Sequence, residues 1–443
     1  MKSIFASHPL RALFGAWHDP RCRLLILFGL EGLLLQYAVS LNSLANNLYA
    51  TNLGATDTQI GLVQTVPNMV AVLFLIPFGL LGGRTRRSRT VPLFLLLFLG
   101  ISYFGYAAVP WLSAGRMEAF FAFLGMTVGG IGIYNAQWQN FFGDAVDMPQ
   151  RNGVLTVRNR CLFFTGVIVP LLCGTLMTAA PHVEEKLRVL QVFYALAGVC
   201  MLLQAFVLWR IPCPARRDEE LNKKAGLAAF RQALGHMIHH RAFRSFFVCI
   251  MLFYFSWHFD WSLWYLAEVQ YAGMNEAQLS LFQALCSVCQ MIFIGFFAGL
   301  CRKKSEHYAI LWACAGLWLC PVMVAGMLWV PMQARAVYFI IIGLVGNIPQ
   351  CVISMCTVQM LLQVCPRANR ALIISLYTLF VTLSNSLLPL LGVQVYTALG
   401  SNEHAVFWVN SIESLVRAGV FILMAVRYRR LKKAGDLFRP LAE

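Results

Sequence analysis

The stretch Gly-Ala-Thr-Asp-Thr-Gln-Ile at residues 54–60 returns in altered form as Gly-Met-Asn-Glu-Ala-Gln-Leu at residues 273–279. The similarity extends without a gap, so that residues 50–90 align with residues 269–309. A chain of two homologous hydrophobic halves is common among proteins that hold a small solute between the halves. The repeat therefore predicts two related bundles with a site between them. Further aligned pairs are Leu62 with Leu281, Gln64 with Gln283, Phe74 with Phe293, Phe78 with Phe297 and, after a short slip, Gly129 with Gly346, Pro149 with Pro366 and Asn152 with Asn369.

The composition predicts that both halves lie in a membrane. Apolar residues make up 59% of the chain and charged residues 12%, about half the ~25% charged fraction of a soluble domain. A helix that spans a bilayer needs roughly 20 mostly apolar residues. We therefore predict an all-α polytopic membrane protein with twelve transmembrane helices in two pseudo-symmetric six-helix bundles. The twelve stretches are residues 24–48, 58–82, 91–109, 118–142, 157–179, 188–209, 244–268, 277–300, 308–329, 336–362, 371–396 and 404–426.

The first stretch is too long for a signal peptide, so we expect it to be retained as a helix. The net charge of +16 fits a topology with both termini in the cytoplasm. In that topology, all but five of the 35 Lys and Arg residues lie in cytoplasmic segments, as is typical of membrane proteins. The basic runs are therefore expected to contact anionic lipid headgroups and do not indicate nucleic-acid binding. The exceptions are Arg116, Lys186, Arg188, Arg335 and Arg417.

We expect four segments along the chain. They are an N-terminal six-helix half at residues 1–210, a cytoplasmic linker at 211–243, a C-terminal six-helix half at 244–427 and a basic cytoplasmic tail at 428–443. The linker contains an amphipathic segment, which is expected to lie along the membrane surface. Its apolar face consists of Leu227, Phe230, Leu234 and Met237.

No cofactor, metal site or ATPase activity is predicted. His236, His239 and His240 have spacings that could bind a metal on a helix, but we interpret them as the polar side of the amphipathic segment. Cys286 and Cys289 lie inside a predicted membrane helix, which favours packing over redox chemistry. The chain contains no Gly-Lys dipeptide, so the nucleotide-binding loop Gly-x-x-x-x-Gly-Lys-Ser/Thr is absent.

Residues 79–89, between the second and third predicted helices, read Gly-Leu-Leu-Gly-Gly-Arg-Thr-Arg-Arg-Ser-Arg. With the twelve helices and the central linker, this stretch resembles the major facilitator superfamily, whose members commonly carry Gly-x-x-x-Asp-Arg-x-x-Arg-Arg there. In that family the aspartate helps latch the two halves on the cytoplasmic side, and Gly83 replaces it here. The resemblance implies gating roles for Gly79, Gly83, Arg84 and Arg87. Residues 166–174 are weakly similar to a motif of drug–proton antiporters, which favours export slightly.

Polar stripes on three predicted helices are candidate substrate contacts. In the first helix, the stripe spans an arc of about 60° at 100° per residue. Such a stripe avoids lipid and faces either a water-filled cavity or another helix. Because the superfamily places helices 1, 4, 7 and 10 around the central cavity, the resemblance implies substrate binding. The stripes are Gln36, Ser40, Ser43 and Asn47 in the first helix, Asn135, Trp138 and Gln139 in the fourth, and Asn347, Gln350, Ser354 and Thr357 in the tenth.

The seventh helix carries a carboxylate among tryptophans, because Trp257, Asp260, Trp261 and Trp264 share one face. A tryptophan-rich wall offers stacking surface to a ring-shaped or amphipathic ligand. A carboxylate near mid-span is costly, which makes it a functional candidate. We predict that Asp260 couples transport to protons. The alternative is a fixed counter-charge to a cationic substrate or to a nearby arginine.

Three other charged residues lie within predicted helices. Glu31, in the first helix, is either a second coupling residue or the partner of a nearby arginine. Glu413 and Arg417 are four residues apart in the last helix, and we interpret them as neutralising each other.

Together, these features predict a secondary active transporter, not an enzyme, that moves a small organic solute by alternating access with proton coupling. The neutral polar and aromatic candidates favour a neutral, polyhydroxylated or amphipathic solute, because no pair of Lys or Arg residues is expected at mid-span. The alternatives are a drug or amphiphile exporter of the same fold, a non-transporting sensor and a passive facilitator. We expect a monomer in the cytoplasmic (inner or plasma) membrane, with the solute, protons and membrane lipids as its partners.

Overall fold

A computed structural model of the chain describes residues 19–217, 221 and 226–441. Residues 1–18, parts of the predicted linker (218–220 and 222–225) and the end of the predicted tail (442–443) lie outside this description. The described residues fold into helices and connecting turns, with twelve spans long and apolar enough to cross a membrane. This confirms the predicted fold class.

The six spans of the first half are α2 (Pro20–Asn52), α3 (Asp57–Arg84), α4 (Thr90–Ala108), α5 with η2 and α6 (Arg116–Leu124, Gly125–Gly129 and Gly130–Ala145), α7 (Met148–Ala179) and α8 (Val183–Arg210). A short helix, α9 (Gly226–His239), precedes the second half. The remaining spans are α10 with α11 and η4 (Arg241–Phe259, Trp261–Leu266 and Ala267–Tyr271), α12 (Glu276–Lys304), α13 (Glu306–Met327), α14 with η5 and α15 (Met332–Asn347, Ile348–Val352 and Ile353–Val364), α16 (Arg370–Ala398) and α17 (Glu403–Ala434).

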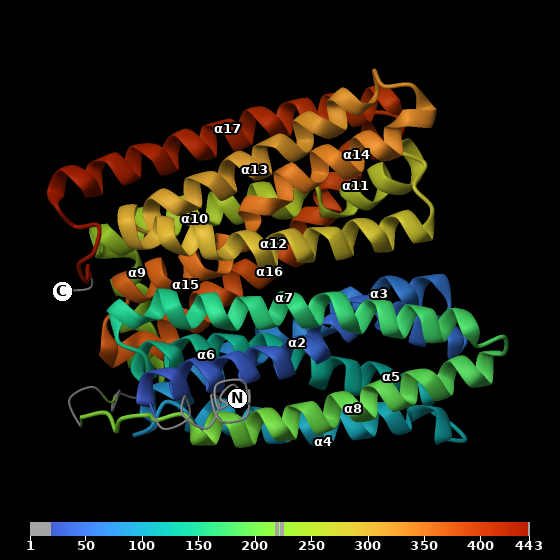
Figure 1. Cartoon of the computed structure of the whole chain (residues 1–443). Helices are drawn as coiled ribbons and strands as arrows, with labels where there is room; N and C mark the ends of the chain where they lie inside the picture. Colours follow the sequence, from blue (N-terminus) through green and yellow to red (C-terminus); the bar gives the residue numbers. More distant parts are fainter. Residues whose placement is uncertain (1–18, 218–220, 222–225, 442–443) are drawn as a thin grey trace, which may run out of the picture.

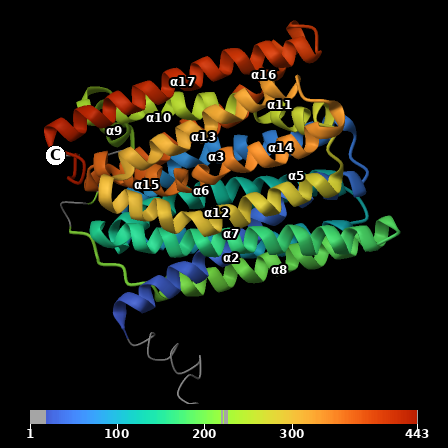
Figure 2. The same cartoon turned by 45° about the horizontal axis from the view of Figure 1, so that its top comes forward.

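The spans form two six-helix bundles, one of α2 to α8 and one of α10 to α17 (Figure 1). Two seams join the bundles: α7 packs against α12, and α3 packs against α16. Figure 2 shows α7 and α12 running side by side along the first of these seams. A site between the bundles would therefore lie between these two seams.

The internal repeat is visible at the starts of α3 and α12. Thr56 and Asn275 each cap their helix by accepting a hydrogen bond from the backbone N–H three residues later, at 3.4 and 2.9 Å. The side chains of Gln59 and Gln278 accept hydrogen bonds from the backbone N–H of the cap residue, which completes a capping box in both halves. The aligned glycine two residues before each cap has a positive φ, a conformation that glycine adopts without strain. The two halves therefore begin this helix with the same local structure.

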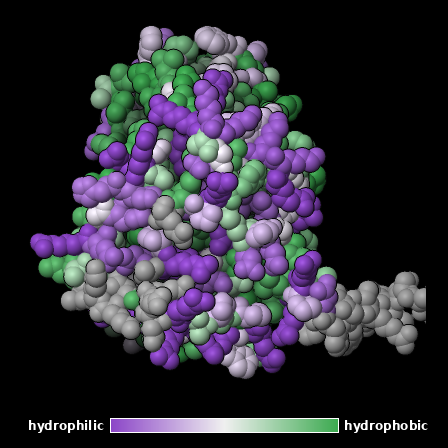
Figure 3. Space-filling model, turned by 90° about the vertical axis from the view of Figure 1, so that its left-hand side faces the viewer, coloured by the Kyte–Doolittle hydropathy of each residue, from purple (hydrophilic) through white to green (hydrophobic). Residues whose placement is uncertain are grey.

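One end of the molecule contains the start of α2, the end of α17 and the short helix α9 (Figure 1). We call it the linker end. Figure 3 looks at this end and shows that hydrophilic side chains cover most of it. Large apolar side chains are instead exposed in the middle of the spans, as expected of a surface that faces lipid. They include Leu73, Ile101, Ile292 and Leu415.

The amphipathic segment is present as α9. It buries Ala229, Ala233 and Met237 against the protein. Of the predicted apolar face, Met237 is therefore covered, whereas Leu227 is 70% exposed. The contact face of α9 lies along the small residues of the helix, because these permit close approach to the bundle.

Three spans are interrupted near their middles. The fourth contains a π-helical turn at Gly125–Gly129, the seventh is broken at Asp260 between α10 and α11, and the tenth contains a 3-10 turn at Ile348–Val352. Discontinuous helices commonly line the substrate sites of transporters, because they expose backbone groups and shift side chains at mid-membrane. These spans are three of the four that the superfamily places around the cavity.

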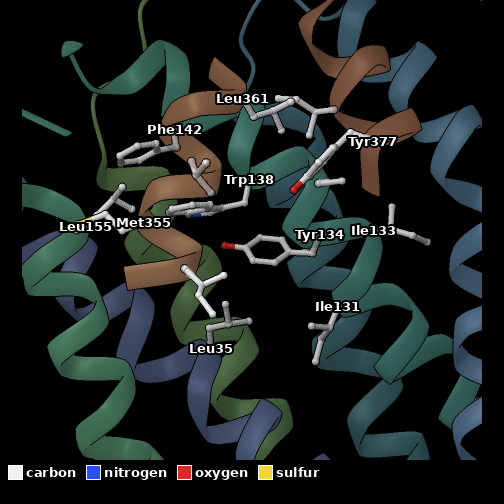
Figure 4. Packing of buried hydrophobic residues seen from close by; sticks show 14 of the residues in the cluster. Leu35, Ile131, Ile133, Tyr134, Trp138, Phe142, Leu155, Met355, Leu361 and Tyr377 are labelled. Carbon is white, nitrogen blue, oxygen red and sulfur yellow. The ribbon is translucent and has the colours of Figure 1, made fainter. Parts of the chain in front are cut away.

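The buried core crosses from one bundle to the other. Figure 4 shows Trp138 and Tyr134 of α6 near Leu35 of α2 and Met355 of α15, which belongs to the second bundle. All four side chains are buried. Lipid tails are as apolar as these side chains, so removing the side chains from lipid gives no hydrophobic gain. Close packing itself therefore favours association of the helices.

Candidate functional site

A cluster of three charged residues, Asp144, Arg216 and Arg370, joins the bundles at the linker end, and we call it the latch cluster. Arg370 Nη1 of α16 lies 2.6 Å from Asp144 Oδ1 of α6, so this ion pair crosses between the bundles. Arg216 Nε, from the segment after α8, lies 2.7 Å from Asp144 Oδ2. Arg216 also donates hydrogen bonds to Asn140 Oδ1 at 2.7 Å and to the backbone oxygen of Gly82 at 3.0 Å. One carboxylate thus holds two arginines where the bundles meet.

Further polar contacts cross the interface between the linker end and mid-span. Gln359 of α15 donates to Asn152 of α7 at 2.7 Å, and Asn152 donates to Glu306 of α13 at 3.4 Å. Gln137 donates to Ser375 Oγ at 3.0 Å. Closer to mid-span, Asn159 of α7 donates to Ser354 of α15 at 3.3 Å. The bundles are therefore closed against each other at the linker end.

The predicted gating residues lie beside this closure. Gly79 is buried, and a Cβ there would lie 2.6 Å from Ser375 Oγ and 3.2 Å from Leu372 Cα of α16. Gly83 is also buried, whereas Arg84 and Arg87 are exposed. Gly83 stands where the family has its latch aspartate, and Asp144 supplies a carboxylate between the bundles instead. Sequence reasoning missed Asp144. The available signal was an acidic residue at the end of the fourth span, facing a mostly basic surface.

We predict that Gly79→Ala destabilises the closed linker end. The added methyl would overlap Ser375, and overpacking costs roughly 1–3 kcal/mol, which outweighs the ~1 kcal/mol that alanine gains over glycine in helix propensity. The matched control is Gly174→Ala in α7, where, apart from the nearby backbone of α7 itself, no atom lies within 4 Å of the added Cβ. Thermal unfolding of the purified protein should show a lower melting temperature for Gly79→Ala and an unchanged or higher one for the control. Equal melting temperatures would contradict the tight fit.

The predicted stripe of the first helix divides into an inner and an outer part. Gln36 Nε2 donates to Ser40 Oγ at 2.9 Å. Both atoms lie within 4 Å of the position that a Cβ on Gly166 of α7 would occupy. Ser287 of α12 borders the same space, so this part of the stripe faces the seam between the bundles. Ser43 and Asn47, nearer the far end, are exposed.

The stripes of the fourth and tenth spans are partly engaged with their own bundles. Gln350 Nε2 lies 3.8 Å from Cys320 Sγ of α13, and Asn347 donates to the backbone oxygen of Gly343 at 2.8 Å. Thr357 is buried and donates to the backbone oxygen of Ile353 at 2.9 Å. Ser354 is exposed and contacts α7 across the interface, as described above. Asn135 and Gln139 are half-buried.

Glu31 lies in a buried network on the first bundle. Arg158 Nε of α7 is 2.7 Å from Glu31 Oε2, and Tyr134 and Gln204 both donate to Glu31 Oε1 at 2.8 Å. The Arg158 guanidinium lies 3.9 Å from the centre of the Trp138 ring, and Trp138 is 3% exposed. Glu31 therefore pairs with a nearby arginine, which was one of its two predicted alternatives.

Two arginines lie deeper in the membrane span than we expected. α7 starts at Met148 rather than at residue 157, so Arg158 and Arg160 lie roughly 15–18 Å along it, at ~1.5 Å per residue. Arg158 is neutralised by Glu31. Arg160 is exposed, and its guanidinium approaches Gly295 of α12 at the seam. The expectation that no Lys or Arg pair occurs near mid-span was wrong in this respect.

The predicted aromatic wall of the seventh span is present. The Trp257 and Trp261 rings meet edge to face at 5.9 Å, and Trp264 lies 4.8 Å from Phe339 of α14. Trp261 is 43% exposed, whereas Trp257 and Trp264 are half-buried. Trp264 Nε1 donates to Glu268 at 2.8 Å.

Asp260 is buried at the break between α10 and α11, beneath this wall. Its Oδ2 lies 2.7 Å from Arg417 Nη2 of α17, and Glu413 Oε1 lies 2.6 Å from the same nitrogen. The contact predicted between Glu413 and Arg417 is confirmed, but it forms only part of a cluster of three. Asp260 thus pairs with a nearby arginine, as its predicted alternative included, although sequence spacing could not identify Arg417 because it does not relate the seventh and twelfth spans.

Two of the three linker histidines form a stacked pair. The His236 and His240 rings are 4.5 Å apart, and His236 Nε2 is 3.2 Å from the backbone oxygen of Val364. Burial lowers the pKa of His236 below its usual 6.5, which favours a neutral ring that donates to this oxygen. Within the described residues, no three His, Cys, Asp or Glu side chains gather as they would around a metal ion.

Solved structures of transporters have the same fold. A bacterial homologue of the iron transporter ferroportin, in an outward-facing state with soaked iron, is 13% identical, with a TM-score of 0.69 over 91% of this chain and 99% of that one. The fucose:proton symporter of E. coli is 16% identical, with a TM-score of 0.67 over 91% and 98%. A proton:xylose symporter, bound to 6-bromo-6-deoxy-D-glucose, is 13% identical, with a TM-score of 0.70 over 95% and 97%.

No curated protein matches the sequence closely. The sequence model of the Major Facilitator Superfamily, however, matches residues 28–357, which is most of the chain. The twelve spans, the two bundles and the repeated capping box agree with that match. The chain therefore belongs to the Major Facilitator Superfamily and is a membrane transporter rather than an enzyme.

Proposed function

We propose that this protein is a secondary active transporter that moves a small organic solute by alternating access, driven by protons. The linker end faces the cytoplasm, since most Lys and Arg residues fall there in the predicted topology. The protein acts as a monomer in the plasma (cytoplasmic) membrane. The contacts at the linker end break and re-form as the bundles rock about the solute.

The observation that carries the proposal is the position of Asp260. Its side chain is 7% exposed, at the break of a discontinuous span that adjoins the aromatic wall. A buried carboxylate within a membrane span is expensive unless it binds a cation or a proton. Asp260 therefore supports coupling of solute movement to proton movement, with Glu31 as the second candidate. Glu31 has Arg158 as its own counter-charge, whereas Asp260 shares Arg417 with Glu413, so we assign the main role to Asp260.

Neutral polar and aromatic side chains between the bundles support a neutral or amphipathic solute. Exposed Ser43, Asn47 and Trp261 offer hydrogen bonds and a ring face to such a solute. Two structural neighbours are symporters of fucose and of xylose, and both sugars are polyhydroxylated, which agrees with this class. The proposed solute-binding residues are Gln36, Ser40, Ser43, Asn47, Asn135, Trp138, Gln139, Trp257, Trp261, Trp264, Asn347, Gln350 and Ser354.

The test is transport in sealed proteoliposomes with an imposed pH gradient. A thermal-stabilisation screen of the purified protein, across sugars, amino acids, nucleosides and lipophilic cations, first selects radiolabelled solutes. Uphill accumulation that collapses when a protonophore is added supports the proposal, and the required gradient direction gives import or export. Flux that only equalises concentrations would indicate a passive facilitator. Binding without flux would indicate a sensor, and preference for lipophilic cations would indicate a drug exporter.

A substitution in the first helix tests the solute path. We predict that Ser43→Leu and Asn47→Leu each reduce transport about tenfold or more, as expected for loss of ~1.4 kcal/mol of binding, while the melting temperature stays unchanged. Ser43→Ala is the control, because it removes the hydroxyl without adding bulk. If these residues instead bond helices together, Ser43→Leu would lower stability by about 0.6 kcal/mol and leave transport intact. That result would assign Ser43 to packing.

A further inference from the structure

Two carboxylates of the second bundle converge on one nitrogen of a single arginine. Asp260 Oδ2 lies 2.7 Å, and Glu413 Oε1 lies 2.6 Å, from Arg417 Nη2. The side chains of all three residues are 7% exposed or less. If both carboxylates were ionised, this buried cluster would carry one uncompensated negative charge, which is unfavourable inside a membrane span.

The oxygens around Arg417 crowd onto one of its nitrogens, whereas its buried Nε has no hydrogen-bond partner in the described part of the chain. Nη2 has two hydrogens but three oxygen neighbours, because the backbone oxygen of Ser256 also lies 3.0 Å from it. Nη1 donates to the backbone oxygen of Leu317 of α13 at 2.5 Å, so two backbone oxygens hold the guanidinium in place. Because both carboxylates bind the same nitrogen, their charges lie close together and repel each other when both are ionised. A proton on either carboxyl group would remove this repulsion.

Glu413 has a further oxygen available for that proton. Glu413 Oε2 is buried, and no hydrogen-bond partner for it is present in the described part of the chain. A buried oxygen without a partner is most costly when its carboxyl group is ionised, and protonation removes that charge. The geometry therefore favours a neutral acid in the cluster.

The other titratable groups around the cluster do not replace this proton. Cys320 of α13 is buried, and a thiol carries no charge. His258 of α10 lies near Asp260 in sequence, but its Nδ1 is 2.6 Å from Ser384 Oγ of α16. From the tenth span, the neighbour of Cys320 is the uncharged Gln350. The charge balance is thus set by Asp260, Glu413 and Arg417.

We propose that Asp260 and Glu413 share one proton beside the guanidinium of Arg417. Glu413 is then the second residue of the coupling site. This inference rests on the proposed proton coupling and extends it to a named pair. Protonation forms one O–H bond on the carboxylate pair, and release returns the pair to its doubly ionised form. Arg417 is a positioning residue, because it is fixed to α10 and α13 by the two backbone oxygens. The charge of the pair thus changes at the break of the seventh span.

The first test needs no solute. Infrared spectra of the full-length protein in lipid nanodiscs, titrated with pH, report protonated carboxyl groups directly. The wild type should show a protonated-carboxyl band at neutral pH that Glu413→Gln and Asp260→Asn each lose, since either variant leaves one carboxylate per guanidinium. Glu403→Gln is the matched control: it lies in the same helix, and its carboxylate also binds an arginine, but its side chain is 55% exposed. The control should keep the band.

An unchanged band in Glu413→Gln would overturn the sharing of the proton. Melting temperatures identify a variant that fails to fold, and Glu413→Asp, which keeps the carboxyl group, should then recover the band. The second test is proton-driven accumulation of the solute selected above, which Glu413→Gln should reduce to the level without a gradient. If the wild type accumulates solute and Glu413→Gln does so equally, the pair is wrong and the proposed function stands. If the wild type shows the band but accumulates no solute, the proposed function fails instead.

Discussion

Asp260→Asn is expected to abolish proton-driven accumulation of the solute while exchange of the solute down its own gradient continues. The substitution keeps the shape of the side chain and removes its titration. The remaining carboxylate, Glu413, would then be balanced by Arg417, so the cluster would bind no exchangeable proton. Both activities should be measured in one vesicle preparation, because their ratio separates coupling from binding.

The control for this prediction is Asp147→Asn, an equivalent change at an exposed carboxylate at the linker end. It should leave both activities unchanged. If Asp260 is instead a fixed counter-charge to a cationic substrate, the Asn variant would lose exchange as well as accumulation. Full proton-driven accumulation in the variant would exclude Asp260 from both roles.

The position of Asp260 could be predicted from sequence, whereas its partner could not. A carboxylate in the middle of an apolar stretch stands out by its cost alone. Arg417 looked like the partner of Glu413, because the two are one helical turn apart. Only the packing of the twelfth span against the seventh brings Asp260 to the same guanidinium. Local spacing thus identified half of the cluster.

The same distinction applies to the interface between the bundles. The repeat and the twelve apolar stretches predicted the fold, because both are visible in the order of residues without knowledge of which segments contact each other. The latch cluster depends on three segments that are remote in sequence: the end of α6, the segment after α8 and the start of α16. Arg158 was missed for a related reason, since α7 begins earlier than hydropathy indicated. A polar helix start continues the span when a partner such as Glu31 neutralises its charge.

The latch cluster leads to the second large effect. Asp144→Asn is expected to open the linker end, because it leaves Arg216 and Arg370 near each other without a carboxylate. Removing one partner of a buried ion pair costs roughly 3–5 kcal/mol. Since ~1.4 kcal/mol changes an equilibrium tenfold, the closed state should lose population by roughly a hundredfold or more relative to the open state.

Chemical labelling can measure this opening at a position inside the closed interface. Ser375→Cys places a thiol where Ser375 now accepts from Gln137 across the bundles. In the wild-type background this thiol should react slowly with a membrane-impermeant maleimide added at the linker end, and Asp144→Asn should accelerate the reaction.

The three residues of the latch cluster should differ in their effects. Arg370→Gln removes the ion pair with Asp144 that crosses between the bundles and should act like Asp144→Asn. Arg216→Gln leaves that ion pair in place, because Arg216, in the segment after α8, is not part of it, and should act more weakly. Asp147→Asn, an exposed carboxylate near the start of α7, should leave labelling unchanged. Equal labelling rates in Asp144→Asn and the wild-type background would mean that apolar packing and the contacts of Asn152 close this end without the latch cluster.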